Sequence, residues 1–413
     1  MIMKYALFGL FAFALFFRSA AASEPIDGGG LGSLDPGALD PEIYKPVPEK
    51  WSEKNRVWQG IPSIEATSDE RVWIVWYSGG KDEGPYNYLL MITSGDGGQT
   101  WSKPFMALDR EDEIRLFDPA LWRDPRGRLW LFWAQSLSTF RPDAKAGEKE
   151  WDGRAGVWGM YTENPEAGEN AEWSVPRRLC DGIMMNKPIV DKKGRWLFPS
   201  ALWHYGKSYY NLPKEKHGAN VYVSTDDGDF LRYLGGTDRN GLATHANEHN
   251  LIELQDGRLW LLSRIDDGIG EAFSEDGGKT WTEMTKTPYK QSSSRTQTRR
   301  LLSGNLLFLK NGPVEGRDGK DVGRSEITAF LSEDEGKTWI GGLVLDGRDR
   351  VSYPDFGQTG DGVIYATWDH DRFGTGEILF ARFTEDDVRA GKFVSEKALP
   401  ARVANRLEKP AAE

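Results

Sequence analysis

Three segments of the sequence place chemically active side chains beside apolar runs that are typical of β-strands, and each segment occurs once. Glu248 and Arg264 flank the run in EHNLIELQDGRLWLLSR, Arg324 precedes the run in RSEITAFLS, and Tyr353 lies in VSYPDFGQ. A phenol with a pKa of about 10 is a weak nucleophile at neutral pH, so it needs a carboxylate to accept its proton and cations to favour the phenolate. Glu248 and the two arginines can supply both. The arginines also suit a carboxylate ligand, because the planar guanidinium forms two parallel hydrogen bonds with it.

A repeated cassette indicates which elements position these side chains. Each copy is a turn of Asp, Gly or Ser followed by an apolar and aromatic run, and a second apolar run precedes it, as in a β-hairpin. The six copies are DERVWIVW at Asp69, RGRLWLFW at Arg126, KGRWLFPS at Lys193, DGRLWLLS at Asp256, SGNLLFLK at Ser303 and DGVIYATW at Asp361. Their spacing of about 47 to 67 residues is the size of one four-stranded propeller blade. The sequence therefore predicts an all-β, six-bladed β-propeller, in which inner-strand residues of different blades converge at one end of a central channel.

A second motif, Ser-x-Asp-x-Gly-x-Thr-Trp, follows some of the hairpins. The full copies are SGDGGQTW, SEDGGKTW and SEDEGKTW, and STDDGDF is a partial copy. The Asp can accept backbone N–H bonds, the Gly can take a positive φ, and the Trp can pack between neighbouring sheets. Because a turn repeated in several blades has a structural task, we assign Asp96, Asp276 and Asp334 to the fold and not to calcium binding or catalysis. These turns resemble the Asp boxes of the sialidase superfamily.

The resemblance extends to the segments that occur once. By this resemblance Tyr353 matches the nucleophilic tyrosine of the superfamily, and Glu248 matches the carboxylate that activates it. Arg264 and Arg324 match two arginines of the clamp that holds the substrate's carboxylate. The resemblance implies an exo-acting glycoside hydrolase that retains anomeric configuration and cleaves a terminal, acidic sugar from a glycan or oligosaccharide.

Blade one departs from the superfamily pattern. The superfamily has an arginine directly before Ile-Pro in the first inner strand, whereas WQGIPSIEA has Gly60 there, so one clamp arginine is missing. The next loop, YSGGKDEGPYNY, holds Asp82 and Glu83 where the superfamily's general acid is expected. Asp118 in LFDPALW is a further candidate, and any of the three carboxyl groups can protonate a leaving oxygen.

Several other residues are candidates for substrate binding, and they leave alternative functions open. Arg295 and Arg299 lie on the segment before Arg324, His249 adjoins Glu248, and Lys187 lies in MMNKPIV. A polysaccharide lyase, or a hydrolase specific for uronate or rhamnose, would use His249 or His245 as its base. A non-catalytic carbohydrate-binding propeller is the other alternative. The histidines lack the tight spacing of a zinc site, so no metal or cofactor is expected.

The N-terminus predicts export. Lys4, the apolar run Tyr5 to Phe17 and the small residues after Ser19 have the order of a secretory signal peptide, which we expect to be cleaved after Ala22. The run is shorter than the ~20 apolar residues of a membrane span, so we expect no membrane anchor after cleavage. The protein is then secreted or periplasmic.

Composition and domain organisation agree with this interpretation. The net charge of −11 and the lack of a basic stretch argue against nucleic-acid binding, which depends on neutralising phosphates. The single cysteine, Cys180, excludes an intrachain disulfide. After the signal peptide at 1–22 we expect a loosely ordered lead-in at 23–50, one propeller at 51–400 and a tail at 401–413.

Overall fold

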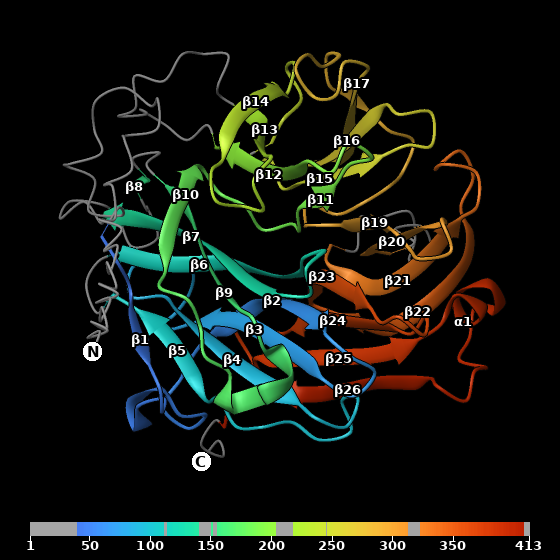
Figure 1. The fold of residues 1–413 in the computed structure, drawn as a ribbon. Helices are drawn as coiled ribbons and strands as arrows, with labels where there is room; N and C mark the ends of the chain where they lie inside the picture. The colour runs from blue at the N-terminus through green and yellow to red at the C-terminus, as the bar shows by residue number, and fades with distance from the viewer. Residues whose placement is uncertain are drawn as a thin grey trace, which may run out of the picture.

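The computed structural model describes residues 39–110, 114–139, 150–151, 155–203, 218–244, 246–312 and 323–408. The described chain is almost entirely β and forms six antiparallel sheets that follow one another around a centre, which confirms the six-bladed propeller (Figure 1). The predicted signal peptide and His245 lie outside the described residues. Among the described residues, no helix has the length and apolar character needed to cross a bilayer.

The first three blades contain strands β1 to β14. Blade one consists of β1 (Glu42–Tyr44), β2 (Gln59–Ala66), β3 (Val72–Ser78), β4 (Tyr88–Ser94) and β5 (Met106–Asp109). Blade two consists of β6 (Ile114–Arg123), β7 (Leu129–Thr139), β8 (Glu150–Trp151), β9 (Gly156–Thr162) and β10 (Arg177–Asp181). Blade three consists of β11 (Ile189–Val190), β12 (Trp196–Leu202), β13 (Gly218–Ser224) and β14 (Arg232–Thr237). Short 3₁₀ helices occupy η2 (Glu49–Trp51) and η3 (Pro165–Asn170).

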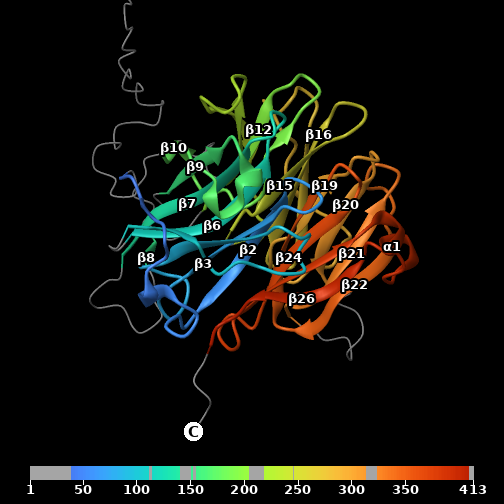
Figure 2. The same cartoon turned by 60° about the horizontal axis from the view of Figure 1, so that its bottom comes forward.

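The last three blades have four strands each. Blade four consists of β15 (His249–Glu253), β16 (Leu259–Ile265), β17 (Gly268–Ser274) and β18 (Thr285–Lys286). Blade five consists of β19 (Gln297–Arg300), β20 (Leu306–Asn311), β21 (Ser325–Ser332) and β22 (Ile340–Asp349). Blade six consists of β23 (Val351–Gln358), β24 (Ile364–His370), β25 (Glu377–Phe383) and β26 (Leu399–Asn405). Among the described residues there is one α-helix, α1 (Glu385–Ala390), which packs against β21 and β22 at the outer rim (Figure 2).

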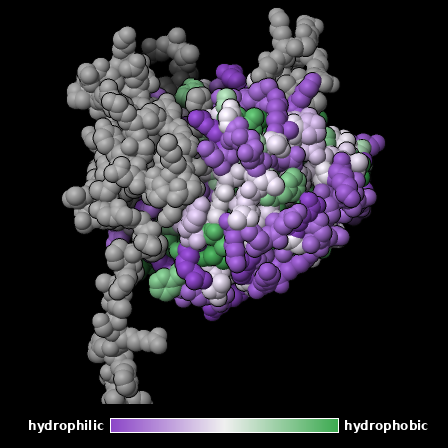
Figure 3. Space-filling model, turned by 90° about the horizontal axis from the view of Figure 1, so that it is seen from above, coloured by the Kyte–Doolittle hydropathy of each residue, from purple (hydrophilic) through white to green (hydrophobic). Residues whose placement is uncertain are grey.

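The six cassettes of the sequence supply the second strand of every blade. All seven residues of β3, and all seven of β12, are buried. Such strands have apolar residues on both faces because each sheet is covered by a neighbouring blade on either side. The view from above shows a mostly hydrophilic surface on which hydrophobic residues form small, separate spots (Figure 3).

The ring closes where blade one meets blade six. Arg56 donates from Nη2 to Oδ1 of Asn405 (2.8 Å), and Gln59 donates from Nε2 to the carbonyl of Gly376 (2.7 Å). The segment from Arg56 to Gly60 thus lies at the closure of the ring. The sheets extend past the predicted limits of 51 and 400, because β1 adds to β5 and β26 continues to Asn405. The three-residue β1 and the largely exposed β26 carry no strong apolar pattern, so the sequence did not reveal them.

The Asp boxes follow the third strands of their blades and build the predicted turn. In the second full box, Ser274 donates to Oδ1 of Asp276 (2.9 Å), and the Thr280 hydroxyl donates to its Oδ2 (2.7 Å). Hydrogen bonds from Thr280 lower the pKa of Asp276. Gly336 of another box has φ +82°, and a Cβ there would lie 2.5 Å from the Trp260 ring of the preceding blade. The boxes therefore fix turns and blade contacts.

Candidate active site

Antiparallel pairing decides which residues can meet at one face of the ring. In each blade the first and third strands begin, and the second strand ends, on the same side, which we call the entry face. Glu248 directly precedes β15, and Arg264 lies near the end of β16. Arg324 directly precedes β21, and Tyr353 is the third residue of β23. All four therefore reach the entry face, although they come from three different blades.

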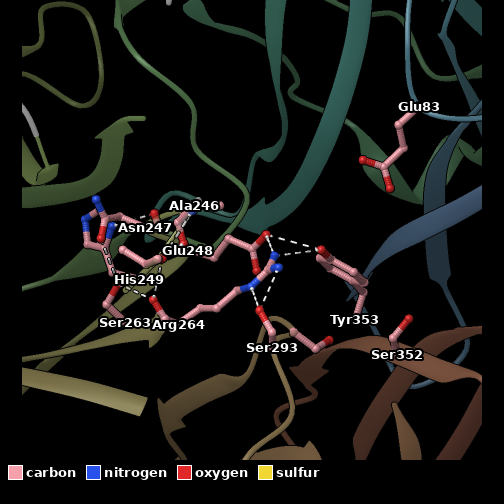
Figure 4. A network of polar contacts seen from close by, with 12 residues as sticks. Glu83, Ala246, Asn247, Glu248, His249, Ser263, Arg264, Ser293, Ser352 and Tyr353 are labelled. Atoms are coloured by element: carbon pink, nitrogen blue, oxygen red, sulfur yellow. Dashed lines mark hydrogen bonds and ion pairs between the residues drawn. The ribbon is translucent and has the colours of Figure 1, made fainter. Parts of the chain in front are cut away.

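Tyr353, Glu248 and Arg264 form one hydrogen-bonded group (Figure 4). The Tyr353 hydroxyl donates to Oε1 of Glu248 (3.2 Å), and Nη1 of Arg264 donates to the same carboxylate oxygen (2.6 Å) and to the hydroxyl (3.1 Å). Burial and the Glu248 carboxylate raise the pKa of Tyr353, whereas the nearby arginines oppose this rise. The phenol is therefore protonated at rest, with its proton directed at the group that can accept it.

Ser293 connects the two predicted clamp arginines. Its hydroxyl accepts hydrogen bonds from Nε and Nη2 of Arg264 (3.1 and 3.0 Å), and its carbonyl accepts from Nε and Nη2 of Arg324 (3.2 and 2.9 Å). The Arg324 guanidinium lies 5.0 Å from the centre of the Tyr353 ring. The loop before β19 thus fixes both guanidinium groups beside the phenol.

Three inner strands share one backbone distortion. In β2, β6 and β23 the pairing register shifts across a residue with positive φ that is followed by proline. These residues are Ile61 (φ +56°), Asp118 (φ +51°) and Tyr353 (φ +57°). Proline cannot donate a ladder hydrogen bond and a positive φ is unfavourable for side chains with a Cβ, so both are placed at a β-bulge. A bulge re-aims the side chain that it carries, and here it sets the direction of Tyr353 and Asp118.

Asp118 is a buried carboxyl group with an unusual proton affinity. Burial raises the pKa of Asp118 to about 8, and the carboxylates of Glu248 and Glu83 add to the rise. Its Oδ2 is buried and has no hydrogen-bond partner among the described residues, as is also true of Oε2 of Glu248 and the hydroxyl of Tyr77. Buried polar atoms without a protein partner are available to a ligand.

The other two acid candidates lie on the loop between β3 and β4. The Glu83 side chain is 39% exposed and accepts a hydrogen bond from Nη1 of Arg372 (2.9 Å). Figure 4 shows its carboxylate pointing toward Tyr353. Asp82 is exposed beside it, and its carbonyl accepts a hydrogen bond from the Asn87 side chain (3.0 Å). Arg372 also lies beside Tyr353, with its Cζ 4.8 Å from the ring centre, so Glu83 and Tyr353 are neighbours of the same guanidinium group.

Arg295 is close to Tyr353, but its guanidinium group is hydrogen-bonded to backbone carbonyls. Its Nη2 donates to the carbonyls of Pro62 (2.8 Å) and Tyr353 (2.9 Å), and its Nη1 donates to that of Met185 (3.0 Å). The side chain is fully buried. It therefore ties together segments of different blades and does not present its guanidinium to a ligand.

Lys187 is likewise part of the channel's interior. Its ammonium group donates to the carbonyls of Ile64 and Leu121, and it pairs with Glu65 and Asp355, each at 3.2 Å. The Lys187 side chain is fully buried. These bonds indicate that Lys187 joins neighbouring blades and does not contact a substrate.

Arg299 and His249 point away from the phenol. Arg299 donates to the carbonyl of Phe356 (3.4 Å) and lies 3.8 Å from Glu65, beside a cavity of about 520 Å³ near the opposite ends of the inner strands. The ring nitrogens of His249 face the carbonyls of Asn220 (2.7 Å) and Asn247 (3.3 Å), and burial lowers its pKa to about 4. Neither residue is brought to Tyr353.

Two further residues of the site, Ser293 and Arg372, are not among those expected from the sequence. Nothing in the sequence marks Ser293, since serines are common in loops. The position of Arg372 could have indicated that it belongs to the site. Second strands end at the entry face, and Arg372 follows the end of the second strand β24, just as Arg264 lies near the end of the second strand β16. Among the described residues, no group of three His, Cys, Asp or Glu side chains is placed to hold a metal ion.

Comparison with known proteins identifies the family. The family model described as a BNR repeat-like domain matches residues 70–366, and no curated protein matches the sequence. The fold is similar to that of the intramolecular trans-sialidase of Ruminococcus gnavus in complex with oseltamivir carboxylate (TM-score 0.60, 15% identity, covering 84% of this chain and 98% of that chain). It is also similar to the leech intramolecular trans-sialidase (TM-score 0.58, 15%, 85% and 71%) and to a protein of unknown function from Dyadobacter fermentans (TM-score 0.57, 16%, 84% and 99%). Because the matched residues make up most of the sequence, the chain belongs to the BNR repeat-like domain family and has the six-bladed propeller fold of the sialidases.

Proposed function

We propose that the protein is an exported glycosidase that cleaves a terminal acidic sugar and retains its anomeric configuration. The observation that carries this proposal is the Tyr353–Glu248–Arg264 group, in which a buried phenol is hydrogen-bonded to a carboxylate and an arginine. A tyrosine replaces the usual carboxylate nucleophile in some glycosidases, and a neutral nucleophile suits an anionic substrate. The signal-peptide pattern of residues 1–22 supports export.

In the first step, the Tyr353 oxygen attacks the anomeric carbon while its proton passes to Oε1 of Glu248. Arg264 contacts both oxygens, so it stabilises negative charge on whichever of them carries it. The bond to the leaving oxygen breaks, and Glu83 donates a proton to that oxygen. We assign this step to Glu83 because it points toward Tyr353 and is exposed enough to exchange protons with water.

In the second step, Glu83 takes a proton from a water molecule, which attacks the anomeric carbon. The Tyr353–carbon bond breaks, and Glu248 returns the proton to the phenolate. Two displacements at one carbon restore the original configuration. Arg264 contacts the attacking oxygen and the Arg324 guanidinium lies 5.0 Å from the centre of the Tyr353 ring, so both would bind a carboxylate attached at or beside the anomeric carbon.

A lyase that uses His249 as its base receives less support from the geometry. A base that removes a proton from a sugar carbon needs a free ring nitrogen in the site, but both nitrogens of His249 face backbone carbonyls. Burial also lowers the pKa of His249 to about 4, which makes it a weak base.

The proposal is tested with aryl glycosides of a sialic acid, a uronic acid and a neutral hexose, using the native protein and Tyr353→Phe. We expect turnover of an acidic sugar that Tyr353→Phe abolishes, and labelling of Tyr353 by a fluorinated analogue that traps the covalent intermediate. Product mass separates hydrolysis from intramolecular transfer, whose product is one water lighter. Equal turnover by Tyr353→Phe, or an unsaturated product, would contradict the proposal.

A further inference from the structure

The space above Gly60 is filled by a side chain from another blade. A Cβ added to Gly60 would lie 2.2 Å from Cδ and 2.5 Å from Cγ of Arg372. Contacts this short do not occur between side chains, so position 60 and position 372 compete for one volume. Gly60 is in the first strand of blade one, and Arg372 is in the loop between β24 and β25 of blade six. The absence of a side chain at position 60 is therefore what admits Arg372.

The guanidinium of Arg372 lies within the same group of cations as the two predicted clamp arginines. Its Cζ is 4.8 Å from the centre of the Tyr353 ring, compared with 5.0 Å for Arg324. Arg264 contacts the phenol oxygen of the same tyrosine at 3.1 Å. Three guanidinium groups from blades four, five and six thus surround Tyr353.

Buried groups hold one side of Arg372. Its Nε lies 3.5 Å from Oδ2 of Asp369, and its Nη2 lies 3.4 Å from the Ser352 hydroxyl. Asp369 is fully buried and also accepts hydrogen bonds from the Ile61 amide (2.8 Å) and from Ser352 (2.7 Å). Such a network fixes the position of the guanidinium, because moving it would leave a buried carboxylate without its cation.

The other side of Arg372 meets a carboxylate that is easier to displace. Nη1 donates to Oε1 of Glu83 (2.9 Å), whose side chain is 39% exposed and lies on a loop. Water can solvate the Glu83 carboxylate once it leaves, whereas the Arg372 side chain is only 6% exposed and still needs a negative charge beside its Nη1. A carboxylate brought by a ligand can therefore replace Glu83 on this nitrogen.

We propose that Arg372 is the third arginine of the substrate's anion site, supplied by blade six in place of blade one, and that the substrate carboxylate displaces Glu83 from it. This assignment rests on the proposed function and extends it in two ways. It names the residue that compensates for Gly60. It also gives Glu83 two states, one bound to Arg372 without substrate and one released toward the leaving oxygen.

The test compares binding of oseltamivir carboxylate with binding of its ethyl ester, in which the carboxylate is masked, by calorimetry on the full-length protein. We expect Arg372→Ala to weaken binding of the carboxylate by on the order of 100-fold and to change binding of the ester by less than fivefold. Glu83→Gln should act in the opposite direction and tighten carboxylate binding, because it removes the competing anion. Arg350→Ala is the matched control, since Arg350 is exposed and pairs with Asp371 of the same loop (2.9 Å).

A second variant separates binding from folding, because Arg372→Ala deprives the buried Asp369 of its cation. The double variant Gly60→Arg with Arg372→Ala places a guanidinium in the same volume from blade one, and it should recover at least tenfold of the lost affinity. If the native protein prefers the carboxylate but the Arg372 variants keep that preference, the assignment of Arg372 is wrong and the proposed glycosidase stands. If the native protein binds ester and carboxylate equally, the anion site itself is wrong, whereas Tyr353-dependent turnover would still support a glycosidase.

Discussion

The hydroxyl of Tyr353 lies 3.2 Å from Oε1 of Glu248, a residue 105 positions earlier in the chain and two blades away in the ring. In the proposed mechanism the phenol proton passes to this carboxylate oxygen. Both side chains are buried, so little water reaches these two oxygen atoms.

The first prediction concerns the pair itself. Tyr353→Phe removes one oxygen and leaves the ring to pack, so the melting temperature should change by only a few degrees while turnover falls by at least about 1,000-fold. Glu248→Gln should give a similar loss. In the proposed mechanism the two residues act as one unit, so the double variant should be scarcely slower than either single variant. Multiplicative losses in steady-state kinetics would show that they act independently.

The second prediction distinguishes the acid. A missing general acid matters most when the leaving group is poor. Glu83→Gln should therefore slow cleavage of a natural oligosaccharide by at least about 100-fold, and cleavage of an aryl glycoside with an acidic phenol by less than about tenfold. Asp82→Asn, on the same loop, is the control and should be near native on both substrates. If Asp118→Asn gives the leaving-group pattern and Glu83→Gln does not, Asp118 is the acid.

The third prediction uses the pKa of Asp118, which burial raises to about 8. In the unfolded chain this carboxyl group loses its proton above its usual pKa of about 4, whereas the folded protein keeps the proton up to about pH 8. The contribution of Asp118 to the free energy of unfolding is therefore fully present below pH 4 and is lost as the pH rises toward 8. Asp118→Asn should therefore raise the free energy of unfolding by about 2 to 4 kcal/mol at pH 8 and change it little at pH 4. Asparagine tolerates the positive φ at this position. Denaturant titrations at the two pH values measure the difference, and a gain that is independent of pH would contradict the assignment.

The fourth prediction separates Arg295 from Arg324. Arg295→Met leaves the carbonyls of Pro62, Met185 and Tyr353 without their donor, and it should lower the free energy of unfolding by about 3 to 5 kcal/mol. Arg324→Ala should cost less stability but should weaken binding of an anionic substrate more than binding of its neutral analogue. Chemical denaturation and inhibition constants measured on both variants test the contrast. A stable Arg295→Met protein with reduced anion selectivity would reverse the two roles.

The blades could be predicted because each leaves a local pattern, whereas the tyrosine group was expected from the resemblance of its segments to the sialidase superfamily. The cassette marks second strands, the Asp box marks the turns after third strands, and Glu248 and Arg264 lie at the two ends of one hairpin. The antiparallel order of a blade then determines which strand ends share a face. The cassettes and boxes involve residues that are close together in the chain, so they are visible in the amino-acid sequence.

The roles of the remaining candidates depend on contacts between blades, and these contacts are not visible in the amino-acid sequence. Arg295 and Lys187 look like free cations in the sequence, yet backbone carbonyls and carboxylates of other blades occupy them. The place of Arg372 after a second strand marks it for the entry face, but its distance from Gly60 in the sequence hides the fact that the two positions share one volume. Ring closure brings these two positions together.

The three proline-containing bulges have a consequence for how this ring can change over evolution. Ile61, Asp118 and Tyr353 hold the same backbone conformation in three blades, but only two of them carry a group that titrates. The scaffold thus offers equivalent positions whose backbone does not depend on the side chain mounted there. A new reactivity at the centre of such a ring would need one codon change at an existing bulge, without a new loop or a shift in strand register. Ile61 is therefore the bulge position at which one substitution would add a third titratable side chain.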